Sequence, residues 1–274
     1  MKPIRQSILS ILPPCWREAF SDRQLEQARQ IHLRLGKPVT VETERAAEPM
    51  NLTAGEEELR FVLNLASRYS PWNASTMAKG YLTAPGGHRI GICGEATETG
   101  FRSVTSLCIR VARDLPGIAG QVPLGEDLLV IGPPGSGKTT LLRDLCRRIS
   151  RTEAVAVVDE RCELFPLWNG VPAWDSGPNT DVLLGKSKGE GIDMVLRSMG
   201  PRWIAVDEIT REEDCRALGQ AAWCGVHLLA SAHAGSVDDL CTRPVYRPLL
   251  ENGLFRRAVV LHNDKSYHME RIGR

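Results

Sequence analysis

The segment that most constrains the fold of this chain is a glycine-rich run, Gly132-Pro133-Pro134-Gly135-Ser136-Gly137-Lys138-Thr139, followed by Thr140. It matches the phosphate-loop pattern G-x-x-x-x-G-K-[ST], with an apolar strand-like run before it and a helical pattern after it. Glycines let such a loop curl until its N–H groups point at phosphate oxygens, and the helix N-terminus adds its dipole. Lys138 can then reach the β- and γ-phosphates, while the Thr139 hydroxyl can ligate Mg²⁺. We therefore predict a site for Mg²⁺ and a nucleoside triphosphate.

Two acidic pairs follow apolar, strand-like runs downstream of this loop. Asp207-Glu208 ends the run at 203–206, and Asp159-Glu160 ends the run at 155–158. The carboxyl ends of parallel strands share the ligand edge of a sheet, so both pairs are expected near the phosphate loop. Asp207 is predicted to hold Mg²⁺ opposite Thr139. Glu208 is favoured as the base that activates water; Glu160 stays open as the alternative base or as a loop ion-pair partner.

A third apolar run, 226–230, leads into Ser231 and His233. Either side chain can sit beside the γ-phosphate and sense its presence or loss, and His233 can equally make a contact at a helix start. Between the acidic pairs, residues 175–191 carry Lys186 and Lys188 among glycines, a proline and an asparagine. That composition predicts a long loop, solvated by default, with closure over the ligand or contact with a neighbouring subunit as the alternatives.

The hydrophobic pattern changes near residue 122, which predicts two domains. Residues 1–122 combine helical stretches at 4–12 and 56–69 with alternating runs at 31–41, 81–95 and 106–113, typical of a small α+β domain with an antiparallel sheet. Residues 123–274 show continuous apolar runs at 128–131, 154–158, 203–206 and 226–230, typical of buried parallel strands. The expected fold class is α/β, a RecA-like P-loop domain preceded by the α+β domain.

Composition narrows the possible partners. The formal net charge is +1 and aromatic residues make up 5% of the chain, which gives no support for a nucleic-acid partner. No apolar run is long enough to cross a bilayer, and the N-terminal run lacks a signal-peptide cleavage site. The eight cysteines form no C-x-x-C pair, so residues such as Cys93 and Cys108 are expected to be buried or free thiols in a reducing cytoplasm.

Several motifs taken together resemble the stage III sporulation protein AA family, which is itself similar to type II and type IV secretion and pilus-retraction ATPases. The resemblance covers nearly the whole chain and rests on the phosphate loop and four further segments: 85–91 (PGGHRIG), 106–113 (SLCIRVAR), 158–161 (VDER) and 230–233 (ASAH). It implies an ATPase that forms a ring of six copies, with ATP at the subunit borders. It also implies a cytoplasmic mother-cell location and a membrane protein of the same sporulation complex as partner, in a channel between mother cell and forespore. Arg89, Arg110 and Arg113 are implied candidates to complete a neighbour's site.

The metal strand departs from many secretion ATPases, because it ends in Asp207-Glu208 where they have Gly-Glu. Which acid is the base therefore stays open. Among the alternatives, a small-molecule P-loop kinase would need an acceptor pocket and an arginine-bearing lid, and a DNA-handling ATPase would need a basic groove with aromatic side chains. A transporter subunit would need a Leu-Ser-Gly-Gly-Gln signature, which the chain does not supply. A nucleotide-gated scaffold with little turnover also remains open.

Overall fold

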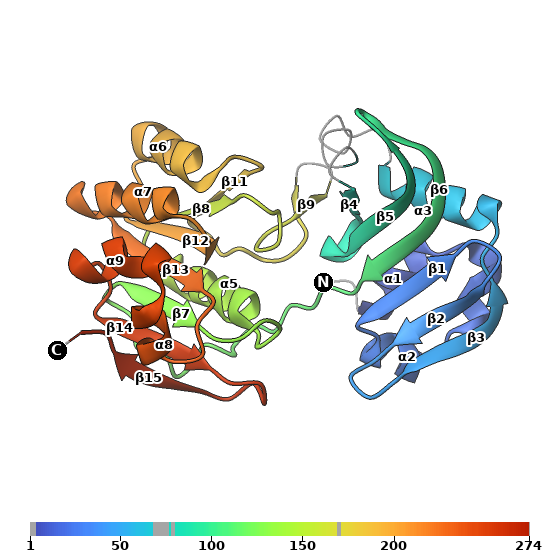
Figure 1. The fold of residues 1–274 in the computed structure, drawn as a ribbon, viewed down its shortest axis with the longest axis horizontal. Helices are drawn as coiled ribbons and strands as arrows, with labels where there is room; N and C mark the ends of the chain where they lie inside the picture. Colours follow the sequence, from blue (N-terminus) through green and yellow to red (C-terminus); the bar gives the residue numbers. More distant parts are fainter. Residues whose placement is uncertain (1–3, 68–76, 78–79, 169–170, 274) are drawn as a thin grey trace. The chain divides into compact units, whose positions relative to one another are not determined.

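The computed structural model describes residues 4–67, 77, 80–168 and 171–273, which form two compact units (Figure 1). The first unit runs to Arg113 and also includes Pro166–Trp174. The second unit consists of Asp114–Phe165 and the chain from Asp175 onward. The chain therefore passes between the units three times. Within the described residues, no helix has the length and apolar character needed to span a membrane.

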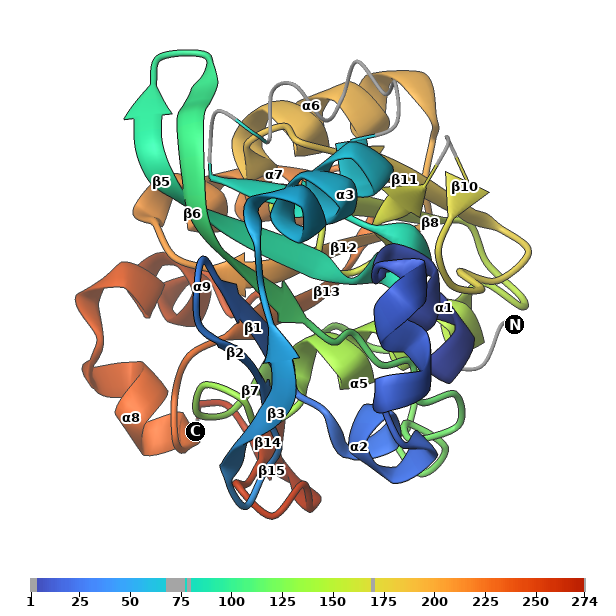
Figure 2. The same cartoon turned by 90° about the vertical axis from the view of Figure 1, so that its right-hand side faces the viewer.

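The first unit contains a six-stranded antiparallel sheet in the order β3-β2-β1-β6-β5-β4. Its apolar side chains form one cluster with the helices, and Figure 2 shows α3 in front of strand β6. The antiparallel sheet predicted from the alternating runs is confirmed. The elements are α1 (Ile4–Ile11), η1 (Pro14–Ala19), α2 (Asp22–Gln27), β1 (Gln30–Arg34), β2 (Pro38–Glu42), β3 (Ala47–Thr53), α3 (Glu56–Ser67), β4 (Tyr81–Thr83), η2 (Pro85–Gly87), β5 (Arg89–Thr97), β6 (Gly100–Arg110), β9 (Leu167–Trp168) and β10 (Val171–Pro172).

Local sequence signals account for most of these elements. Helix α1 ends before two prolines, which cannot continue a helix, and the hairpin predicted at 31–41 pairs Ile31 with Val41. Helix α3 is confirmed to Ser67, and the rest of the predicted stretch, to Tyr69, lies outside the described residues. Of the two alternatives predicted for Cys93, the free thiol holds and burial does not: its thiol is exposed, because β5 extends beyond the packed part of the sheet.

The Gly86-Gly87-His88 segment connects several parts of the first unit. Gly87 has φ +76°, and a Cβ there would lie 2.6 Å from the Trp174 ring, so only glycine fits. His88 is fully buried; its Nδ1 accepts the Ala112 N–H at 3.1 Å, and its Nε2 lies 2.8 Å from Ser7 Oγ. The contact with Trp174 explains why 166–174 belongs to the first unit.

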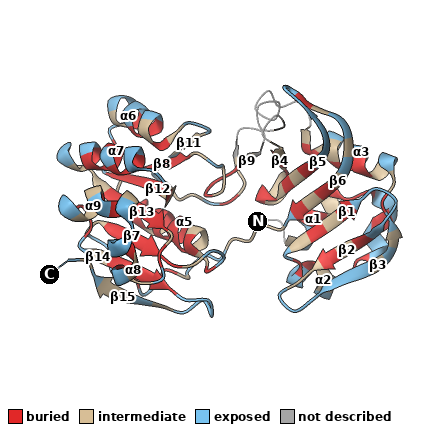
Figure 3. Cartoon of the chain, in the orientation of Figure 1, coloured by how far each residue is buried: buried red, intermediate tan, exposed pale blue. Residues whose placement is uncertain are grey.

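The second unit contains a seven-stranded sheet in the order β11-β8-β12-β13-β7-β14-β15, parallel except for its last pair. The four predicted strands are confirmed, and Figure 3 shows the central ones as buried. The elements are β7 (Leu128–Ile131), α5 (Lys138–Ile149), β8 (Val155–Asp159), β11 (Thr180–Leu184), α6 (Lys188–Ser198), β12 (Trp203–Ile209), α7 (Glu212–Trp223), β13 (His227–Ala232), α8 (Val237–Thr242), η3 (Pro244–Tyr246), α9 (Arg247–Glu251), β14 (Arg257–Leu261) and β15 (Tyr267–Arg271).

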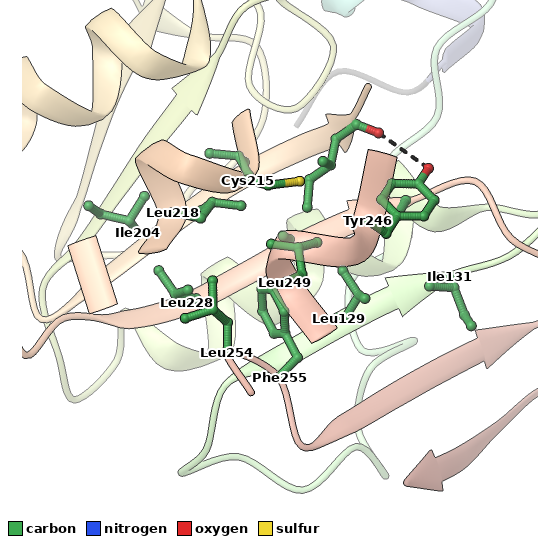
Figure 4. Packing of buried hydrophobic residues seen from close by; sticks show 14 of the residues in the cluster. Leu129, Ile131, Ile204, Cys215, Leu218, Leu228, Tyr246, Leu249, Leu254 and Phe255 are labelled. Carbon is green, nitrogen blue, oxygen red and sulfur yellow. Dashed lines mark hydrogen bonds between the residues drawn. The ribbon is translucent and has the colours of Figure 1, made fainter. Parts of the chain in front are cut away.

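Helices cover both faces of this sheet. Side chains of α5 pack with one face, and those of α6, α7, α8 and α9 pack with the other. Figure 4 shows part of the cluster formed with α6, α7, α8 and α9, in which Leu218, Leu228, Leu249 and Phe255 lie together. Continuous apolar strands are explained by this burial on two sides, because neither strand face meets water.

The prediction of a solvated loop at 175–191 is wrong. Residues Thr180–Leu184 form β11, which pairs in parallel with β8, and α6 begins at Lys188. The Ser187 hydroxyl accepts the Glu190 N–H at 3.3 Å and caps that helix. Glycine and proline in this stretch mark the turns on either side of a short edge strand.

Residues 114–122 belong to the second unit, although the expected domain boundary placed them in the first. Two side chains of helix α5 fix them. The Asp144 carboxylate accepts N–H groups of Gly117 and Ala119 at 3.0 and 2.9 Å, and Arg147 donates to Asp114 at 2.7 Å. Ala119 is fully buried in the core beside α5. The prolines and glycines of this stretch therefore mark turns inside the second unit, and the chain changes units after Arg113.

Candidate functional site

The phosphate-loop segment connects strand β7 to helix α5. Gly135 and Gly137 have φ of +73° and +106°, a region that glycine adopts without strain. Gly137 is the N-cap of α5, and no side chain caps that end, so its first N–H groups remain available for an anion. Gly132 must also lack a side chain, because a Cβ there would lie 2.7 Å from Ser136 Oγ. The predicted strand–loop–helix arrangement is confirmed.

An open pocket of about 360 Å³ lies at this loop. Six of the nine predicted loop residues line it, and the other three, Gly132, Pro133 and Ser136, do not. Residues that line the pocket come from the loop, from the ends of β12 and β13, and from the segment after β8: Pro134, Gly135, Gly137, Lys138, Thr139, Thr140, Glu163, Asp207, Glu208 and His233.

Two polar groups of the loop bear on whether phosphate and Mg²⁺ fit here. Ser136 Oγ is buried and has no hydrogen-bond partner within the described part of the chain. The buried Lys138 ammonium donates to the carbonyls of Gly132 and Pro133 at 2.8 and 2.9 Å. Burial lowers the pKa of Lys138, while Asp207 and Glu208 act in the opposite direction. A hydroxyl without a partner and a cation at the pocket wall both suit an anionic ligand.

The Asp207-Glu208 pair lies where β12 has a bulge against β13, between Val206 and Ile209. Asp207 Oδ2 accepts the Thr139 hydroxyl at 2.7 Å, and its other oxygen accepts the Ser231 hydroxyl. A hydroxyl and a carboxylate in contact at the pocket are oxygen donors of the kind that Mg²⁺ prefers. The structure thus brings together Thr139, Asp207 and Ser231, as the sequence pattern predicted for the first two.

Glu208 follows in a left-handed backbone conformation with φ +53°, which is unusual for a residue other than glycine. Its N–H donates to Ser231 Oγ at 2.8 Å. Its carboxylate contacts His233 Nε2 at 2.9 Å through one oxygen and accepts from Arg161 through the other. The bulge therefore places Glu208 in the pocket wall with both oxygens in contact with neighbouring side chains.

His233 connects the loop lysine to Glu208. Its Nδ1 lies 3.0 Å from Lys138 Nζ, and its Nε2 contacts Glu208. Because an ammonium group can only donate and a carboxylate can only accept, Nδ1 is the acceptor and Nε2 carries the proton. The Tyr246 hydroxyl, labelled in Figure 4, accepts the His233 N–H at 3.3 Å and donates to the Ile209 carbonyl at 3.4 Å. Sequence reasoning did not identify Tyr246.

The other acidic pair occupies different positions. Asp159 is buried and accepts N–H groups of Glu163, Leu164 and Phe165, which shapes the turn after β8. Burial raises the pKa of Asp159 to about 6, against the lowering effect of these donors. Glu160 does not line the pocket.

Glu160 instead accepts from Lys188 Nζ at 2.9 Å, and Arg211 lies 3.7 Å away. Burial acts to raise its pKa, yet the hydrogen bond and charge of Lys188, with two arginines, leave that pKa below its ordinary value. Lys188 itself is 2% exposed and lies 3.7 Å from Asp214. The burial of Lys188 was not predicted from the sequence. Glu163, which lines the pocket, was not predicted either; in the sequence only its place in the acidic run after β8 could have indicated it.

The three candidate arginines belong to the first unit. The Arg89 guanidinium lies 4.0 Å from the centre of the Tyr81 ring, and Arg110 is exposed at the end of β6. Arg113 donates to the carbonyl of Ala28 at 2.9 Å and to that of Glu26. Burial lowers the pKa of Arg113, with Arg29 adding to the effect. Arg113 is therefore engaged within its own unit.

The parallel sheet, the phosphate loop and the Thr139–Asp207 contact define the class of RecA-like P-loop proteins. The chain belongs to the family described as sporulation stage III, protein AA, whose model matches residues 2–271. It is 38% identical to stage III sporulation protein AA of Bacillus subtilis (strain 168), over 94% of this chain and 91% of that protein. It is also 27% identical to Protein SEEDLING PLASTID DEVELOPMENT 1 of Arabidopsis thaliana, over 89% of this chain and 36% of that protein.

Solved structures support the same fold class. The pilus retraction motor PilT with bound ADP matches with a TM-score of 0.59 at 16% identity, over 87% of this chain and 75% of that chain. The Legionella pneumophila ATPase DotB matches with a TM-score of 0.57 at 19% identity, over 91% of this chain and 78% of that chain. At these identities the likeness concerns the fold alone.

Proposed function

We propose that this protein hydrolyses ATP with Mg²⁺ at the pocket between the phosphate loop and the ends of β12 and β13. The observation that carries the proposal is the hydrogen bond between Thr139 and Asp207 at the wall of a pocket that also holds Lys138 and Glu208. A hydroxyl and a carboxylate on opposite sides of a phosphate loop supply the protein oxygens that hold Mg²⁺ in P-loop enzymes. When bound, Mg²⁺ supplies neutralisation of phosphate charge.

Each residue then has a distinct task. Loop N–H groups and Lys138 bind the phosphates, and the oxygens of Thr139 and Asp207 would hold Mg²⁺. Glu208 accepts the proton of a water molecule whose oxygen forms a bond to the γ-phosphorus as the bond from that phosphorus to the ADP oxygen breaks. Glu208 is preferred over Glu160 because Glu208 lines the pocket, whereas Glu160 is paired with Lys188 outside it.

We place this activity in a homo-oligomeric ring, with six copies as the expected number. Support comes from the fold shared with a pilus retraction motor and the ATPase DotB, and from family membership. Within that family, the proposed role is to energise or assemble a channel complex between mother cell and forespore, through a membrane protein of the same complex. Arg89, Arg110 and Arg113 are the arginines proposed to complete a neighbouring copy's site.

The experiment is steady-state phosphate release as a function of protein concentration, with the molecular mass measured on the same samples. We expect the rate per copy to rise as a larger assembly forms, because neighbouring copies complete the sites. A rate per copy that stays constant in a monomer would overturn the ring and favour a small-molecule kinase, which a screen for phosphorylated acceptors would then test.

One observation favours a second candidate, a nucleotide-gated scaffold with little turnover. Both oxygens of the Glu208 carboxylate are in contact with other side chains, His233 and Arg161. A base held in this way is not ready to receive a proton. Tight binding of Mg-ATP with negligible phosphate release at every protein concentration would support the scaffold.

A further inference from the structure

The contact between Arg161 and Glu208 joins two loops at the edge of the sheet. Strands β8 and β12 are parallel neighbours in which Val158 pairs with Val206, so the residues that follow them lie side by side. The turn after β8 is fixed by the three N–H groups that Asp159 accepts and by Cys162, which has φ +57°. This turn delivers the Arg161 guanidinium to Glu208.

The two side chains of this pair differ in how firmly they are held. Glu208 is 20% exposed, and its backbone is fixed by the bulge, by the hydrogen bond to Ser231 and by a left-handed conformation. Arg161 is 49% exposed, and it has a long side chain. The arginine can therefore move into solvent without disturbing the sheet, while the position of Glu208 stays set by its backbone.

The two carboxylate oxygens of Glu208 contact different parts of the site. Oε1 contacts His233, which in turn contacts Lys138, a residue of the proposed phosphate site. Oε2 accepts from Arg161, which does not line the pocket. A general base needs a lone pair directed at the proton that it removes, and a guanidinium on the carboxylate competes with water for it.

We propose that Arg161 is a positioning residue that restrains Glu208 in a resting orientation and so limits the basal rate of hydrolysis. Release of the arginine frees one carboxylate oxygen for water, while His233 continues to connect that carboxylate to the phosphate-binding lysine. This inference rests on the proposed function, because it assigns Glu208 as the base. It makes Arg161 a point at which a neighbouring copy or a partner with an acidic group, by pairing with the guanidinium, accelerates turnover.

The test compares the wild-type protein with Arg161→Ala, Arg161→Lys and the control Arg216→Ala, using phosphate release and nucleotide binding. Arg216 is a similarly exposed arginine that pairs with Glu212 on helix α7. We expect Arg161→Ala to raise kcat roughly two- to fivefold, the range expected for loss of a half-exposed ion pair. KM and the affinity for ATP stay unchanged, Arg161→Lys gives a smaller rise, and Arg216→Ala gives none.

A merely structural contact would change stability or affinity and would not raise kcat alone. In a Glu208→Gln background, Arg161→Ala should have no effect, since the base is already gone. When the wild-type protein releases phosphate at a measurable rate, an equal or lower kcat in Arg161→Ala overturns the restraint. The proposed ATPase activity fails separately, when neither the wild-type protein nor any Arg161 variant releases phosphate although the protein is folded.

Discussion

The Thr139 hydroxyl donates a 2.7 Å hydrogen bond to Asp207 Oδ2. These residues are far apart in the sequence, one in the first turn of α5 and the other at the end of β12. Strands β7 and β12 each lie beside β13 in the parallel sheet, so their carboxyl ends reach the same edge. The contact is thus a consequence of sheet topology, and it brings two oxygen ligands to one wall of the pocket.

Asp207→Asn tests the metal side of this site. An amide is a weaker ligand for Mg²⁺ than a carboxylate, so the Mg²⁺ concentration for half-maximal phosphate release should rise roughly tenfold or more. The measurement is a Mg²⁺ titration at saturating ATP. Asp181→Asn, at an exposed aspartate of β11, serves as the control and should leave the titration unchanged. An unaltered titration in Asp207→Asn would remove Asp207 from the metal site.

Lys188→Met tests the buried ion pairs behind Glu160. The substitution keeps the aliphatic stem but leaves Glu160 and the buried Asp214 without the ammonium group that lies between them. Loss of one partner from a buried pair costs about 3–5 kcal/mol, so the denaturant midpoint should fall clearly. The control is Lys186→Met, because Lys186 is half-exposed and pairs weakly with Glu190; its cost should stay below about 0.5 kcal/mol. Equal effects of the two substitutions would contradict the buried role of Lys188.

Local signals were sufficient for the parts of the fold that depend on few neighbours. Glycine spacing alone predicts the phosphate loop. Short apolar runs predict the four buried strands, and a helical pattern predicts the helix after the loop. Asp207 was predictable for the same reason, because a strand that ends in acids is visible in the sequence. The family predicted from the sequence motifs is confirmed, because the family model matches residues 2–271.

Long-range contacts explain what the sequence could not provide. Strand β11 forms because an exposed edge of β8 accepts it, and its flanking glycines and proline resemble a loop. Lys188 is buried because Glu160 and Asp214 surround its ammonium group, which charge pattern alone cannot indicate. Segment 166–174 returns to the first unit because Trp174 packs against Gly87. Each of these contacts joins residues that lie far apart in the chain.

His88 makes the stability of the protein depend on pH. Burial lowers its pKa to about 4, with Arg113 contributing, from 6.5 in the unfolded chain. Below pH 6.5 the unfolded state therefore binds more protons than the folded state, so stability falls as pH decreases from about 6.5 to 4. At about 1.4 kcal/mol per pKa unit, the loss at pH 4 is on the order of 3 kcal/mol.

Denaturant unfolding between pH 4 and 7.5 measures this effect, in the wild-type protein and in His88→Gln. The glutamine cannot titrate, so its variant should be less stable at neutral pH and should lose less stability on acidification. His262→Gln, at an exposed histidine of the other unit, serves as the control. The same pH dependence in His88→Gln and in the wild-type protein would show that His88 does not cause it.

The central claim is that Glu208 activates water at the phosphate-loop pocket, and a comparison of Glu208→Gln with Glu160→Gln and Lys138→Ala tests it most directly. Binding of ATP and phosphate release are measured on each protein. We expect Lys138→Ala to lose binding, Glu208→Gln to bind ATP but release phosphate about a hundredfold or more slowly, and Glu160→Gln to keep most of its turnover. Normal turnover in Glu208→Gln together with lost turnover in Glu160→Gln would contradict the claim and assign the base to Glu160.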